Sequence, residues 1–69
     1  MRYDIETELE EDGRWIAEIS SLPGAMAYGK TRSDAIANVT AIALRIIADR
    51  VEHAEMLGSP LSVSFDAAA

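Results

Sequence analysis

The residues best able to do chemistry in this sequence are carboxylates near the N-terminus. From Asp4 onward, acidic residues fill every second position of the run RYDIETELE, and a further one lies on the next predicted strand. These residues are Asp4, Glu6, Glu8, Glu10 and Glu18. Carboxylates at period two share one face of a β-strand, and such a row can bind Mg²⁺ in a nuclease. It can equally be a solvated strand face or a face that docks a basic protein. We favour the last two interpretations, because the chain supplies no general base and no second carboxylate cluster.

A second candidate is a match to the phosphate-binding pattern G-x-x-x-x-G-K-T. Its four defining residues are Gly24, Gly29, Lys30 and Thr31. A P-loop follows a buried strand of a parallel sheet and needs a further acidic strand for Mg²⁺. Here the four intervening residues, AMAY, themselves have the character of a strand. We therefore interpret the match as coincidental and expect no nucleotide.

The remaining reactive residue types are isolated. His53 is the single histidine, and the chain has no cysteine, so a structural zinc is not expected. No serine lies in a G-x-S-x-G setting. Trp15 follows a hairpin turn and is interpreted as a core residue. The sequence thus predicts no catalytic residue, no metal, no cofactor and no enzyme activity.

Charge and size point to protein partners. The 69 residues form a single domain, 1–69, with a net charge of −6. That charge opposes direct nucleic-acid binding and favours a basic protein partner. A domain this small is marginally stable alone, and without disulfides it is expected to form a homo-oligomer, either a dimer or a tetramer. The sequence shows neither an export signal nor an apolar run long enough to cross a bilayer, so a cytoplasmic location away from membranes is expected.

Two strands and a hairpin are predicted to position the acidic row. Apolar and acidic residues alternate over 2–10, and a second strand is expected over 14–20. Asp12-Gly13 between them predicts a two-residue hairpin turn, because both residue types tolerate positive φ. Pro23-Gly24 then predicts a second turn.

The second half is predicted to hold a strand, a long helix and a last strand. A third strand is expected over 25–30. Thr31, with Asp34 three residues later, resembles a capping box and opens a helix that continues to about Met56. Its end is marked by Gly58 and Pro60. A last strand is expected over 61–65, with a frayed tail over 66–69.

These elements predict an α+β fold, a β-β-β-α-β two-layer sandwich. A right-handed crossover gives the spatial strand order 3-2-1-4. Whether the last strand pairs within its own chain or across a dimer stays open. If Ala25, Ala27 and Gly29 face the helix, other residues must lie on the uncovered face. We interpret these as a partner or oligomer interface: Ile16, Met26 and Tyr28.

The order of these motifs resembles the HicB-like antitoxin family, over about residues 3–57. The residues that carry the resemblance are Asp12-Gly13, Trp15, Ala17, Leu22-Pro23-Gly24, Tyr28-Gly29, Thr31 and Asp34-Ala35, the last pair in place of the family's Glu-Ala. The resemblance implies a partial RNase H-like fold without RNase H catalysis. It also implies an oligomeric antitoxin that neutralises a small basic, mRNA-cleaving HicA-type toxin by occluding it.

One departure from the family narrows this expectation. The family's C-terminal helix-turn-helix or ribbon-helix-helix has no counterpart before Ala69, so operator binding is not expected. Two alternatives stay open. One is an orphan oligomer of the same fold with a structural or regulatory role and no toxin. The other is a metal-dependent nuclease that uses the acidic strand.

Overall fold

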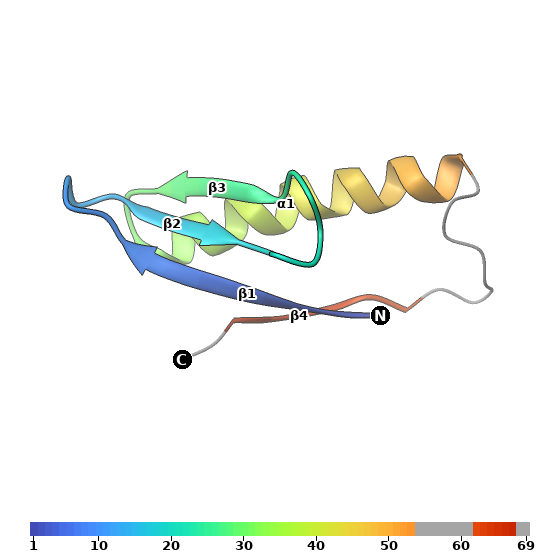
Figure 1. Ribbon diagram of the computed structural model, residues 1–69, viewed down its shortest axis with the longest axis horizontal. Coiled ribbons are helices and arrows are strands. Elements are labelled where there is room, and N and C mark those ends of the chain that lie inside the picture. Colours follow the sequence, from blue (N-terminus) through green and yellow to red (C-terminus); the bar gives the residue numbers. More distant parts are fainter. Residues whose placement is uncertain (54–61, 68–69) are drawn as a thin grey trace.

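Four strands and one helix make up residues 1–53 and 62–67, the parts of the chain that the computed structural model describes. The elements are β1 (Arg2–Leu9), β2 (Trp15–Glu18), β3 (Met26–Gly29), α1 (Arg32–Glu52) and β4 (Ser64–Ala67). They form one mixed sheet in the order β3-β2-β1-β4, with β4 parallel to β1, and α1 runs along one face of this sheet (Figure 1). The predicted α+β class and strand order are therefore confirmed. The last strand pairs within its own chain.

The turn between β1 and β2 is longer than the sequence predicts. The Glu10 N–H donates to the Arg14 carbonyl at 2.7 Å, and the Gly13 N–H donates to the Glu10 carbonyl at 3.0 Å. Gly13 has φ of +90°, which favours glycine. The connection is therefore a turn followed by one residue in the left-handed conformation, and the prediction of a two-residue hairpin turn was wrong. The extra length moves Glu10 out of the strand and into the turn.

The strand boundaries also differ from the predicted ones. Both β2 and β3 are shorter than expected, at four residues each. The last strand covers Ser64–Ala67 instead of 61–65, so Asp66 is not part of a frayed tail. Its position follows from contacts with β1 that are distant in sequence: Phe65 stacks on Tyr3 with ring centroids 5.7 Å apart. Residues 68 and 69 of the predicted tail lie outside the described residues.

Helix α1 begins at a well-formed cap. The Thr31 hydroxyl accepts the Asp34 N–H at 3.1 Å, and the acidic Asp34 lies in the first turn, near the positive end of the helix dipole. The helix ends at Glu52, four residues before the expected end, with His53 as its C-cap. The stop signals Gly58 and Pro60 lie outside the described residues.

The core lies between α1 and strands β1, β2 and β3. One row of the helix is fully buried: Ala35, Val39, Ala43 and Ile47. Ala17 and Ala27 face it from the sheet, and their small side chains allow a close approach. The closest approach is at Gly29, where an added Cβ would overlap the Ala35 nitrogen and lie 2.8 Å from the Asp34 carbonyl carbon. The opposite face of β3, which carries Met26 and Tyr28, is exposed.

Candidate functional site

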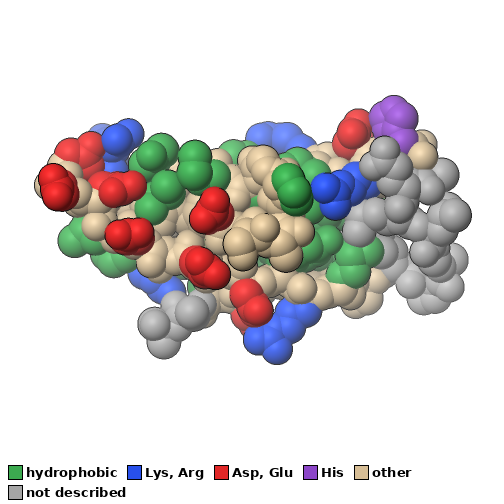
Figure 2. Space-filling model, in the orientation of Figure 1, with side chains coloured by type: hydrophobic (Ala, Val, Ile, Leu, Met, Phe, Trp, Pro, Cys, Tyr) green, Lys and Arg blue, Asp and Glu red, His purple; other side chains and the backbone are tan. Residues whose placement is uncertain are grey.

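The candidate site is the face of the sheet that α1 does not cover, here called the open face. The strand register arranges its side chains in rows across the sheet. One row is Glu8, Ile16 and Tyr28, and the next is Glu6, Glu18 and Met26. In Figure 2, acidic side chains gather over β1 and the β1–β2 turn, and hydrophobic side chains lie beside them over β3. The open face thus joins a charged half to an apolar half.

The apolar half comes from the edge of the sheet. Met26 is 46% exposed and Tyr28 is 40% exposed, while Ile16 between Tyr28 and Glu8 is half-buried. The backbone of Tyr28 is also tied to α1, because the side-chain amide of Asn38 donates a hydrogen bond to the Tyr28 backbone carbonyl at 2.8 Å. The sequence places these apolar residues on the uncovered face correctly, and their role as an interface stays a prediction.

In the described part of the chain, the carboxylates of the acidic half form few ion pairs with bases. Glu6 lies directly opposite Glu18 in the register, and like charges in that position repel. Within the described residues no salt bridge reaches Glu6, Glu8 or Glu18. A cationic partner would therefore relieve a repulsion that the fold itself creates.

The far end of the acidic row is different. Asp4 on β1 lies opposite Asp66 on β4, and Arg2 contacts both carboxylates, at 3.2 and 2.7 Å. This arginine is a structural partner that the sequence did not reveal, because the position of β4 was misplaced. Asp4 is thus a paired residue, and the uncompensated charge is concentrated on β1 and β2.

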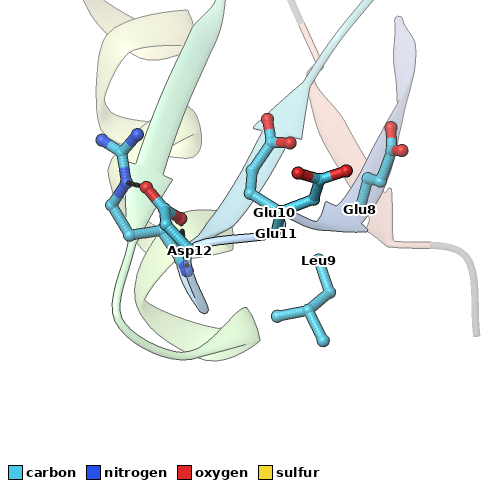
Figure 3. A pocket seen from close by; sticks show the side chains of 6 residues that line it. Glu8, Leu9, Glu10, Glu11 and Asp12 are labelled. Carbon is cyan, nitrogen blue, oxygen red and sulfur yellow. Dashed lines mark hydrogen bonds and ion pairs between the residues drawn. The ribbon is translucent and has the colours of Figure 1, made fainter.

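An open hollow of about 480 Å³ lies beside the β1–β2 turn, lined by residues 8–12 and Arg14. Figure 3 shows the carboxylates of Glu8, Glu10 and Glu11 on one side and Leu9 turned away from them. Small-molecule pockets are usually enclosed and mostly apolar. This hollow is neither, so it does not indicate a small-molecule ligand.

Arg14 links the turn to the open face. Its backbone N–H and its Nε donate to the two carboxylate oxygens of Asp12, at 3.0 and 2.7 Å. The backbone bond, and then the side-chain bond, hold the pKa of Asp12 below its ordinary value of 3.8. The Arg14 guanidinium carbon also lies 4.3 Å above the centre of the Tyr28 ring. Sequence reasoning did not single out Arg14, although residues 14 and 16 share a strand face and Ile16 pairs with Tyr28.

The other chemical candidates have no site in the described parts of the chain. In residues 1–53 and 62–67, no three histidine or acidic side chains are placed so that they could hold a metal ion. His53 lies at the helix end, where its Nδ1 is 2.7 Å from the Asp49 carbonyl oxygen. The segment between the two glycines of the phosphate-binding pattern is strand β3, not a loop. Among the described helices, none is long and apolar enough to cross a membrane.

The chain was compared with known proteins. The chain is similar to UPF0150 protein Ta0767 of Thermoplasma acidophilum, with 28% identity over 57 residues that make up 83% of each chain. That name states no activity, substrate or partner. No protein-family model matches the chain. No solved structure is significantly similar to it.

Proposed function

We propose that this protein is a HicB-like antitoxin, a non-enzymatic protein-binding domain. Its partner would be a small basic, mRNA-cleaving toxin of the HicA type, which it neutralises by occlusion. The proposal rests on the motif order of the sequence and on one structural observation. This observation is the open face, on which exposed Tyr28 and Met26 lie beside Glu6, Glu8 and Glu18.

The physical chemistry of the open face suits this role. Carboxylates without basic partners speed the encounter with a basic protein and disfavour acidic ones. Exposed apolar side chains supply the buried area that a stable complex needs. The net charge of −6 means that the chain as a whole also attracts basic proteins more than acidic ones. A partial RNase H-like fold remains part of this proposal.

Co-expression tests the proposal directly. The small basic protein encoded beside this chain should arrest growth of a bacterial host, and this chain should restore growth. Charge reversal on the open face, in Glu6→Lys or Glu8→Lys, should abolish the rescue. Glu52→Lys is the matched control, because it makes the same charge change on the helix. If no neighbouring toxin exists and no ribonuclease is neutralised, the antitoxin proposal fails.

We also propose that the chain self-associates. The exposed apolar side chains include Met26 and Tyr28 on the sheet and Leu44 and Val51 on the helix, which give two candidate surfaces. Sedimentation velocity at micromolar concentration should show a dimer or tetramer. Paired serine substitutions on each surface identify the interface, since only the correct pair should yield monomers. A stable wild-type monomer contradicts this proposal and leaves the antitoxin proposal untouched.

A further inference from the structure

The ring of Tyr28 already holds a cation that belongs to the chain itself. The guanidinium carbon of Arg14 lies 4.3 Å from the ring centre, well within the range of about 6 Å over which a cation is attracted to an aromatic face. The ring is on the open face, where 40% of the Tyr28 surface is exposed. The geometry thus places a guanidinium over a ring that is partly exposed to solvent.

The contact is easy to open. The side chain of Arg14 is 54% exposed and that of its partner Asp12 is 53% exposed. Interactions between exposed charges are weak, because water competes for both groups. The 2.7 Å bond from the Arg14 Nε to that carboxylate lies between the same exposed groups, so water competes for it as well. The ring can therefore be vacated at little cost.

The surroundings carry more negative charge than Arg14 offsets. Glu8, Ile16 and Tyr28 form one continuous row across three strands. Neighbouring strands lie about 4.8 Å apart, so the Glu8 and Tyr28 backbones are separated by roughly 10 Å. An extended peptide crossing this row would meet the aromatic ring, an apolar residue and a carboxylate in succession. Glu8 has no salt bridge within the described part of the chain.

We propose that the open face binds an arginine-bearing segment of a protein partner, and that one partner arginine replaces Arg14 on Tyr28. This inference rests on the protein-binding function proposed above and names the chemistry that its face recognises. Arg14 competes with the partner arginine for the Tyr28 ring and covers the ring while no partner is bound. Once Arg14 has moved away from the ring, the incoming guanidinium gains both the ring and the nearby carboxylates.

The arrangement selects arginine over lysine. A guanidinium is planar and weakly hydrated, so it stacks on an aromatic face while its edge donates to carboxylates. An ammonium is a strongly hydrated point charge and gains less from the ring. The acidic residues alone would attract both cations similarly. A preference for arginine would therefore show that the Tyr28 ring contributes to binding.

Calorimetric titration at low ionic strength tests the inference with two synthetic eight-residue peptides. One alternates arginine with serine, and the other alternates lysine with serine. The arginine peptide should bind more tightly. Arg14→Gln should strengthen its binding roughly two- to fivefold, because an exposed cation–π contact no longer competes. Arg45→Gln on the helix is the control, because it makes the same charge change away from the open face and should have a smaller effect.

Substitutions of the ring complete the test. Tyr28→Leu should remove the preference for arginine, while Tyr28→Phe should keep it, and circular dichroism confirms that both variants are folded. Equal binding of both peptides by the wild type, or identical effects of Arg14→Gln and Arg45→Gln, overturns the inference. Toxin neutralisation in co-expression would then still uphold the proposed function. Conversely, the expected peptide behaviour without any neutralised toxin would overturn the antitoxin role and leave the arginine site standing.

Discussion

Glu6 and Glu18 lie directly opposite each other across strands β1 and β2. Both are exposed, and neither has a salt bridge within the described residues. A fold optimised only for stability would place a lysine at one of these positions. This repulsion supports the proposed docking of a cationic partner on the open face, since stability and function often conflict at binding sites.

Removing this repulsion should stabilise the protein. We expect Glu18→Gln to raise the free energy of unfolding by a few tenths of a kcal/mol, at the low end of the range of about 0.2–1 kcal/mol for cross-strand pairs, because solvent screens both carboxylates. Urea denaturation measures the change. Glu8→Gln is the control on the same face, because Glu8 lies opposite Ile16 and relieves no direct pair. Equal stabilisation by both variants would show that the gain comes from the lower net charge and not from relief of the Glu6–Glu18 repulsion.

The close approach of β3 to α1 should not tolerate a side chain at Gly29. We expect Gly29→Ala to lower the free energy of unfolding by roughly 1–3 kcal/mol, because the added methyl group meets the Ala35 and Asp34 backbone. Thermal and urea unfolding give this value. The adjacent exposed residue provides the control variant, Lys30→Ala, which should change stability little. A Gly29→Ala variant as stable as the wild type would contradict the close approach.

The helix cap should contribute measurably to stability. Thr31→Ala removes the hydroxyl that accepts the Asp34 N–H, and we expect a loss of about 1 kcal/mol. Thr31→Ser should restore most of this loss, because the hydroxyl is retained. Ser33→Ala, in the first turn but outside the cap position, is the control. Urea denaturation measures these differences as shifts of the midpoint, provided that the dependence of the unfolding free energy on urea concentration is unchanged.

The Asp12–Arg14 contact should make the turn sensitive to acid. Since the folded-state pKa of Asp12 is lowered, its contribution to stability is present above the ordinary value of 3.8 and is lost as the pH falls through the folded pKa. The wild type should therefore be more stable than Asp12→Asn at neutral pH. This advantage should shrink as the pH falls below 3.8. A difference that stays constant with pH would mean that the carboxylate charge does not stabilise the turn.

Much of the fold could be read from local patterns in the sequence. The alternation over residues 2–10 reflects one buried face of β1, and Thr31 marks the start of α1 because an N-cap needs only neighbours within one turn. The order of elements then limits the topology to a few arrangements, of which the right-handed crossover is favoured. The bounds of β4 could not be found in this way, because residues 61–67 alternate between apolar and polar without a break, so the pattern marks no boundary. The register of β4 depends on Phe65 meeting Tyr3 and on Asp66 meeting Arg2.

The sequence by itself determined which residue types this protein presents: an acidic strand, an apolar third strand and a long capped helix. Only the tertiary structure decided which of these residues meet. The register of β1 and β2 placed Glu6 opposite Glu18, and Arg2 formed an ion pair with Asp4. The register of β2 and β3 brought Arg14 over Tyr28. The physical reason is that side-chain alternation is a local property of the chain. Pairing across strands is fixed instead by contacts between distant residues, and a shift of one residue would turn every side chain to the other face.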